Sequence, residues 1–364
     1  QDVRDVFVEV LCNPDGSEPT RASDHYEHDG ECIPFEIFEA GTLNGEPISY
    51  PVSVHGAVVG TALWEGRPVA LTRQRSTFGR DGLNLAALKA MTEGDATTAE
   101  EFYEVADRFG FTFNWGYANR EEHAYYASGR LPVRAEGLDR RLPTLGTGEY
   151  EWQGFLELSE HPHADGHPSG RLLNWNNQSA PGFMHGDSTP FGSVHRVELF
   201  DQWPDQVDLA GVVSVMNRAA TEDVRSPAWP VVSDVLDTGD APSPLAAEVV
   251  AVLDDWVERD APRLDADGDG FHDEPGPLIL DTLWDPLVEA VLQPVLGDLA
   301  LETRGISPES IVDKDLRTVL GEDVEGPFNL QYCGEGDLES CAGALWSAVD
   351  RVAGELAAEY GDDT

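Results

Sequence analysis

The pattern of apolar and polar positions changes near residue 200. Before that point it is typical of strands, because apolar residues alternate with polar ones or form short runs between glycine-rich turns. The segments that fit this pattern are residues 48–59, 62–73, 111–118 and 123–129. We expect turns at 59–60 and 65–68, and a tight connection at 119–120 between the last two strands.

Helical spacing marks one segment before residue 200 and most of the chain after it. In the first part, Thr98 and Glu101 form a capping box ahead of an apolar helix face. In the second part, Ser243 and Pro244 supply an N-cap and a proline at the first helical position. Further helices are predicted over 277–296, 308–320 and 338–360. We therefore expect an α+β fold, with a β-rich portion over residues 1–200 and a mainly helical portion over 201–364.

The composition narrows the classes of function. The 364 residues include 68 Asp and Glu but only 23 Lys and Arg, which gives a formal net charge of −45. Such a surface repels nucleic-acid phosphates and anionic membranes, so we expect neither as a partner. No apolar run reaches the ~18 residues of a membrane-spanning helix. The basic residues are almost all arginines, which fits either adaptation to high salt or a GC-rich genome.

The four cysteines form two local pairs in polar stretches. Cys12 and Cys32 are one pair, and Cys333 and Cys341 are the other. An even count with short spacings predicts two disulfides and an oxidising, secreted or periplasmic location. The alternative is four unrelated thiols. The chain opens abruptly on a strand-like run, so we expect it to be a piece of a longer precursor.

An asparagine-rich stretch is the first candidate for chemistry. Asn174, Asn176 and Asn177 surround Trp175, in a segment that we place at a strand end. Asparagine is poor in strands, so each side chain needs polar partners. A side-chain amide in this position can donate its N–H to a developing oxyanion. The alternative is a loop held together by its own hydrogen bonds.

Several motifs then occur in a specific order. They are FTFNWGYAN at 111–119, ASGRLPVR at 127–134, RLPTLGTG at 141–148, WQG at 152–154 and NWNN at 174–177. Their order and spacing resemble the β-chain of the penicillin acylase family over roughly residues 1–200. That family consists of N-terminal nucleophile hydrolases with a four-layer αββα fold. The resemblance implies an amidohydrolase that cleaves an N-acyl bond of a small-molecule substrate, together with an α-chain cut from the same precursor.

The resemblance also implies roles for individual residues. Asn176 matches the asparagine of the family's oxyanion hole. Arg196 matches an arginine that supports this asparagine and the nucleophile. Phe113 is expected to line an apolar acyl pocket. The substrate itself stays open between β-lactams, acyl-homoserine lactones and lipopeptides.

A calcium site is implied in the same way. Asp2 and Asp5 would supply carboxylates and Arg4 its backbone carbonyl. Arg140 would add a second carbonyl, and Asp187 a further carboxylate. Hard oxygen ligands of this kind suit Ca²⁺. The alternative for each aspartate is an ordinary solvated charge in an acidic chain.

The first residue departs from the family pattern. Gln1 cannot serve as an attacking N-terminal hydroxyl or thiol. In the family the nucleophile lies upstream of the calcium segment, so we expect this chain to be an internal part of the enzyme and inert on its own. The rival hypothesis is a non-catalytic, calcium-stabilised binding or structural module derived from such enzymes.

Two further segments resemble metal sites. Asp265, Asp267, Asp269 and Asp273 occupy the first, third, fifth and ninth positions of an EF-hand-like loop, but Gly276 stands where the bidentate Glu belongs. We expect either a looser second calcium loop or an acidic turn. The histidines of 161–167 could hold a transition metal, but alternating histidines in such a loop are more often solvated.

Overall fold

A computed structural model of the chain describes residues 3–166, 170–184, 195, 197–200, 203–204, 206–303, 309–324 and 331–361. The chain divides into two compact units, residues 1–191 and 192–364, close to the predicted change of pattern. The first unit is mixed β and α, and the second is helical. None of the helices in the described part is long and apolar enough to cross a bilayer.

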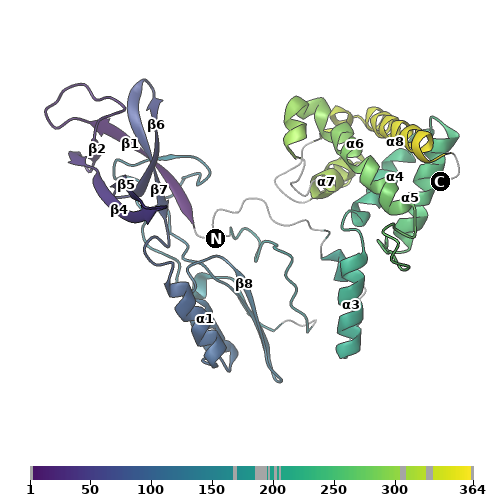
Figure 1. Ribbon diagram of the computed structural model, residues 1–364, viewed down its shortest axis with the longest axis horizontal. Helices are drawn as coiled ribbons and strands as arrows, with labels where there is room; N and C mark the ends of the chain where they lie inside the picture. Colours follow the sequence, from purple (N-terminus) through teal and green to yellow (C-terminus); the bar gives the residue numbers. More distant parts are fainter. Residues whose placement is uncertain are drawn as a thin grey trace. The chain divides into compact units, whose positions relative to one another are not determined.

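The described residues of the first unit contain two sheets (Figure 1). The larger has the order β3-β2-β1-β7-β6-β5-β4, and β10 pairs in parallel with β1. The smaller has the order β11-β9-β8. The strands are β1 (Arg4–Cys12), β2 (His25–His28), β3 (Glu31–Pro34), β4 (Glu36–Leu43), β5 (Glu46–Ser53), β6 (Gly56–Trp64), β7 (Arg67–Arg75), β8 (Asn114–Ala118), β9 (His123–Ala127), β10 (Thr144–Leu145) and β11 (His163–Asp165).

Strand β1 lies inside the larger sheet and carries two acids on its inner face. Alternation along the strand buries Asp5, Phe7 and Glu9 on one side, while Val6 and Val8 lie on the other side and are half-buried. Seven consecutive positions pair antiparallel with β7, so the direction of each β1 side chain is fixed by the ladder. Carboxylates at inner positions must find partners, because an unpaired buried charge is strongly unfavourable.

The predicted turn at residues 59–60 is wrong. Residues 56–64 form the single strand β6, and Gly60 follows a β-bulge in its pairing with β7. The chain reverses earlier, between Ser53 and Gly56. Gly56 has φ +116° and lies directly against the carbonyl of Arg73, where a Cβ would clash. The backbone therefore turns at Gly56, where only glycine fits. Gly60 is accommodated by the β-bulge within β6.

Where the structure describes the first unit, it contains two α-helices, α1 (Leu83–Glu93) and α2 (Ala99–Ala106). The α2 cap agrees with the predicted one, since Thr98 Oγ1 accepts from the Glu101 N–H at 3.2 Å. The Glu101 carboxylate, however, accepts from Thr97 rather than from the cap residue. Helix α1 was not predicted, because its buried face consists of Asn84 and two alanines while its leucines are exposed.

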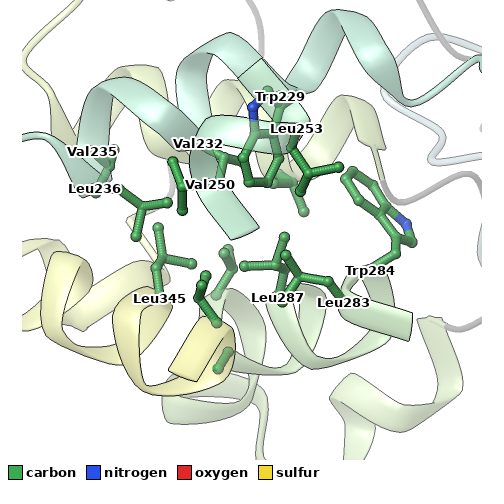
Figure 2. Close-up of a cluster of buried hydrophobic side chains, with 14 of the residues drawn as sticks. Trp229, Val232, Val235, Leu236, Val250, Leu253, Leu283, Trp284, Leu287 and Leu345 are labelled. Atoms are coloured by element: carbon green, nitrogen blue, oxygen red, sulfur yellow. The ribbon is translucent and has the colours of Figure 1, made fainter. Parts of the chain in front are cut away.

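The second unit is a helical bundle with its own core. Its helices are α3 (Leu209–Thr221), α4 (Trp229–Leu236), α5 (Pro244–Glu258), α6 (Gly276–Leu296), α7 (Glu309–Val319) and α8 (Leu338–Tyr360). Figure 2 shows Trp229, Leu253, Leu287 and Leu345 meeting between helices α4, α5, α6 and α8. The Ser243 cap of α5 is confirmed, because its hydroxyl accepts from the Ala246 N–H at 3.1 Å.

Both predicted disulfides form. Cys12 and Cys32 join β1 to β3, with their Cα atoms 6.0 Å apart. Cys333 and Cys341 join a 3₁₀ turn to the first turns of α8. The alternative of four unrelated thiols is therefore wrong. The 3₁₀ segments of the described part are Leu158–Glu160, Glu198–Phe200, Ser226–Ala228, Gly297–Thr303 and Cys333–Gly336.

Candidate active-site and calcium segments

The asparagine-rich segment is an irregular loop and not a strand end, which corrects the prediction. The Asn174 side chain accepts from the Asn176 N–H at 2.9 Å, and the Asn177 amide donates to the Gln178 carbonyl at 2.8 Å. Gln178 in turn donates to the carbonyl of Phe183 at 2.8 Å. The outer asparagines therefore hold the loop, which agrees with the self-bonded alternative for these two residues.

Asn176 differs from its neighbours. Its backbone is left-handed, with φ +65°, a conformation that asparagine tolerates better than most residues. Its side chain is exposed and makes no hydrogen bond with the described residues. The loop thus fixes the backbone of Asn176 through Asn174 and leaves the carboxamide available to a ligand.

The loop is linked to the smaller sheet. The Tyr125 hydroxyl on β9 interacts with the Ser179 side chain and donates to Asn114 Oδ1 at 2.5 Å. Burial is the main reason why the pKa of Tyr125 is raised to about 12, so it remains a neutral donor. Asn114 is the first residue of β8 and directly follows Phe113 in the chain.

Phe113 has the exposure that a pocket residue needs. Its side chain is 49% exposed, and its ring meets Trp115 edge-on with centroids 5.7 Å apart. Trp115 is fixed by stacking on Phe109 at 4.3 Å and by donating to Ser128 Oγ at 2.9 Å. Phe113 therefore presents an apolar face beside a rigid aromatic pair.

The calcium segment is only partly within the described residues. Asp2, Asp187 and Arg196 lie outside them. Arg4 opens β1 opposite Arg75, and Arg140 lies in the irregular segment before β10.

Asp5 has side-chain partners that were not predicted. Its Oδ2 accepts from Arg134 Nε at 2.6 Å and from Trp152 Nε1 at 2.8 Å, and its Oδ1 accepts from Arg134 Nη2 at 2.8 Å. Because each carboxylate oxygen has two lone pairs, only one lone pair of Oδ1 remains for a cation. The sequence signal for such partners is that Asp5, an acid, occupies an inward-facing position of an alternating strand.

The acidic loop after α5 gathers three of its four aspartates. Asp265, Asp267 and Asp269 each bring one carboxylate oxygen within 4.8 Å of the others, and all three are exposed. Asp265 accepts from the N–H groups of residues 268–270, which curls the loop around it. Asp273 instead accepts from the Ala266 N–H. Gly270, at the sixth position, has φ +93°, as the sharp turn requires.

Of the two described histidines in segment 161–167, His161 is buried, contrary to the expectation for that loop, whereas His163 is exposed, as expected. His161 is 3% exposed, and its Nδ1 donates to the Ala127 carbonyl at 2.9 Å. His163 Nδ1 donates to the His161 carbonyl at 2.7 Å, and its ring meets Tyr103. His167 lies outside the described residues. These contacts dock the segment onto β9 and α2.

Comparisons with curated proteins agree with the resemblance. The chain is 30% identical to penicillin G acylase of Escherichia coli over 190 residues, which are 50% of this chain and 22% of that protein. It is 28% identical to acyl-homoserine lactone acylase QuiP of Pseudomonas syringae pv. tomato over 205 residues, which are 54% of this chain and 24% of that protein. The chain thus spans a quarter or less of the curated relatives that it matches.

A solved structure matches over the whole chain. Thermostable penicillin G acylase from Alcaligenes faecalis has a TM-score of 0.77 at 22% identity, covering 100% of this chain and 66% of that one. At this identity the match shows a shared fold. The sequence model of the penicillin amidase family matches residues 1–364. The chain therefore belongs to the penicillin amidase family.

Proposed function

We propose that this chain is an internal part of an amidohydrolase that cleaves N-acyl amide bonds through an N-terminal nucleophile lying outside the chain. The hydroxyl or thiol of that residue attacks the carbonyl carbon, while its own α-amine takes up the proton. The C–N bond breaks when the tetrahedral intermediate collapses, and the α-ammonium gives its proton to the leaving amine. Water then attacks the acyl-enzyme, which releases the carboxylic acid and restores the nucleophile. The observation that carries this proposal is the exposed carboxamide of Asn176, which makes no hydrogen bond within the described part of the chain, on a loop held by Asn174 and Asn177.

Asn176 would stabilise the tetrahedral intermediate by donating its Nδ2–H to the oxyanion. A single donor of this type is worth about 2.7–4 kcal/mol of the barrier. Its backbone is fixed before substrate binds, so little reorganisation is needed. Arg196 would support the asparagine and the nucleophile, and Phe113 would contact an apolar acyl group.

The remaining parts of the enzyme would come from the same precursor. An α-chain and the segment carrying the nucleophile would complete a four-layer αββα arrangement. Two disulfides suit an oxidising compartment, so we place the enzyme outside the cell or in the periplasm.

We propose Ca²⁺ as the structural ion of this enzyme. Asp2, Asp5 and Asp187 would bind it with carboxylates, and Arg4 and Arg140 with backbone carbonyls. Asp5 would be monodentate because Arg134 and Trp152 occupy its other lone pairs. A second ion would bind at the loop of Asp265, Asp267, Asp269 and Asp273. Calcium would neutralise the gathered carboxylates and hold the loop geometry.

The test is hydrolysis of a panel of chromogenic N-acyl amides by the complete precursor, with the N-terminus of each product chain sequenced. We expect self-cleavage ahead of a Ser, Thr or Cys and release of the chromophore. The rival, a calcium-stabilised module without catalysis, is favoured if a folded and correctly disulfide-bonded precursor neither cleaves itself nor hydrolyses any member of the panel.

A further inference from the structure

Glu9 lies at the centre of a buried polar cluster in the larger sheet. Its side chain is completely buried. Oε1 accepts from Ser53 Oγ at 2.5 Å, from Thr72 Oγ1 at 2.8 Å and from His55 Nδ1 at 2.8 Å. Oε2 has no hydrogen-bond partner among the described residues. A buried carboxylate of this kind requires a compensating positive charge nearby.

His55 connects this carboxylate to the surface. It lies in the turn between β5 and β6, and its ring stacks on Phe7 with centroids 4.0 Å apart. Because Nδ1 is bonded to Glu9, the other ring nitrogen, Nε2, points outward and lies 2.8 Å from Oε1 of Glu151. Glu151 is 43% exposed, so the outer end of the cluster can be reached from solvent.

His28 on β2 approaches the same point. Its Nδ1 donates to the Gly146 carbonyl at 3.1 Å, so its Nε2 is the nitrogen left for a ligand. Its ring meets that of His55 edge-on at 5.6 Å. Gly146 is required here, because a Cβ at this position would collide with the Glu9 carboxylate. His28, His55 and Glu151 each offer one ligand atom, and these atoms lie within 4.8 Å of one another.

We propose that His28, His55 and Glu151 form a binding site for a transition-metal ion, with Zn²⁺ as its ion. Two imidazole nitrogens and a carboxylate oxygen are a ligand set that zinc takes in proteins. Both histidines have the second shell typical of zinc ligands, since each Nδ1 is bonded to an oxygen acceptor that sets the tautomer and aims Nε2. This site is separate from the proposed calcium segments and does not depend on the proposed function.

The geometry requires only small movements. Tetrahedral ligands at about 2.0 Å from zinc lie about 3.3 Å apart, and the exposed Glu151 side chain can swing to meet this spacing. The fourth zinc ligand would be water or the carboxylate of Asp29, whose Oδ2 lies 3.6 Å from His28 Nε2. The ion would join β2, the β5–β6 turn and the segment after β10, which are far apart in the sequence.

The competing interpretation is a hydrogen-bonded Glu9–His55–Glu151 relay without metal. Burial lowers the pKa of His55, but the bonds to Glu9 and Glu151 outweigh this and leave the pKa raised. An imidazolium would then supply the positive charge. In that relay His28 has no part in neutralising the buried carboxylate. A requirement for His28 therefore distinguishes the metal site from the relay.

The test uses the full chain, stripped of transition metals by dialysis against EDTA and then returned to chelator-free buffer that contains Ca²⁺, so that the proposed calcium sites stay filled. Titration calorimetry with ZnCl₂ should give one site, and Co²⁺ should produce the intense visible absorption of a tetrahedral site. Glu9→Gln should weaken zinc binding about ten- to a hundredfold through the second shell. His28→Gln and Glu151→Gln should weaken it further. The His28 side chain is 16% exposed and that of Glu151 43%, so the fold of both variants is checked by far-UV circular dichroism.

The matched control is His25→Gln, which removes a histidine from the same strand, where it is bonded to Asp24. Its zinc affinity should equal that of the wild type. The proposal is overturned if the wild type takes up no zinc, or if His28→Gln and Glu151→Gln bind it as tightly as His25→Gln does. Retention in those variants with loss in His161→Gln would instead assign the ion to the other histidine segment and also overturn the proposal.

Discussion

Both oxygens of the Asp5 carboxylate are bound by the guanidinium of Arg134, with N–O distances of 2.6 and 2.8 Å. The two side chains are 11% and 17% exposed, so the pair lies mostly out of water. This bidentate contact joins the first strand to a segment 129 residues later. It is the geometry in which arginine and carboxylate interact most strongly.

We predict that Arg134→Ala destabilises the first unit by about 3 kcal/mol, because it leaves a mostly buried carboxylate without its counter-charge. The measurement is the urea midpoint, monitored by tryptophan fluorescence. Arg141→Ala is the control, since its partner Asp139 is in solvent. Equal midpoints for the two variants would show that the Asp5 pair contributes no net stability.

The pH dependence of the helical unit should reflect Asp223. Burial raises the pKa of this carboxyl, but bonds from Arg225 and Arg263 outweigh burial and lower it. A folded pKa below the unfolded value of about 3.9 contributes stability that is full above that value and is lost as the pH falls through the folded pKa. The loss of stability below about pH 4 should therefore be smaller in Asp223→Asn than in the wild type.

Urea unfolding between pH 6 and pH 2 measures this difference. Asp240→Asn, at an exposed position, should follow the wild-type curve. Parallel curves for the wild type and Asp223→Asn would contradict the assignment.

Calcium should act on stability rather than on substrate binding. At a hundredfold excess over Kd, an ion that binds only the folded state adds about 2.7 kcal/mol. We expect EGTA to lower Tm and Asp187→Ala to remove most of that response, with little change in KM for the enzyme that survives. The effect of EGTA on the Tm of Asp269→Asn tests separately the proposed second calcium site, in the loop of residues 265–273. A melting curve that is indifferent to EGTA would exclude a stabilising calcium ion.

Asn176→Ala in the complete enzyme should lower kcat about a hundredfold or more and leave the fold intact, because an oxyanion donor acts mainly in the transition state. Alanine is less favourable than asparagine in a left-handed backbone, so Tm should fall about as much as in a control variant with the same backbone conformation. Asn44→Ala is a matched control, since Asn44 is also exposed and left-handed, with φ +53°. A kcat for Asn176→Ala near that of Asn44→Ala would remove Asn176 from the proposed oxyanion hole.

Arg196→Ala should slow turnover or block precursor maturation, because a guanidinium there would position the asparagine and the nucleophile. The measurements are gel analysis of processing and kcat for any mature enzyme. Arg196→Lys should recover part of the activity if charge is the main contribution. Normal processing together with normal kcat would contradict this role.

The features that could be predicted from the sequence are those formed by residues close together in the chain. The Ser243 cap and Thr98 cap involve residues three positions apart, so spacing alone reveals them. The β5–β6 turn was misplaced because its cause is distant: Gly56 is needed where the backbone meets Arg73. Helix α1 was missed because its buried face consists of small residues and an asparagine.

In the candidate sites, too, short-range contacts could be predicted and contacts between distant residues could not. The motif around Asn176 could be recognised, and its division of roles with Asn174 is short-range. The partners of Asp5 and Glu9 could not be found, because they depend on which strands pair and in what register. An acid at an inner position of an alternating strand predicts that a partner exists, but the sequence does not identify it.

The disulfide between Cys12 and Cys32 has a practical consequence for producing the protein. Strand β2 is paired with β1 at only two positions, so the covalent link adds to the packing of buried Tyr26 in holding the hairpin of β2 and β3 on the sheet edge. In a reducing cytosol the hairpin would detach more often, and each opening would carry His28 away from His55 and Glu151. Material expressed there would be a mixture of attached and detached forms, whereas export to an oxidising compartment would give one species.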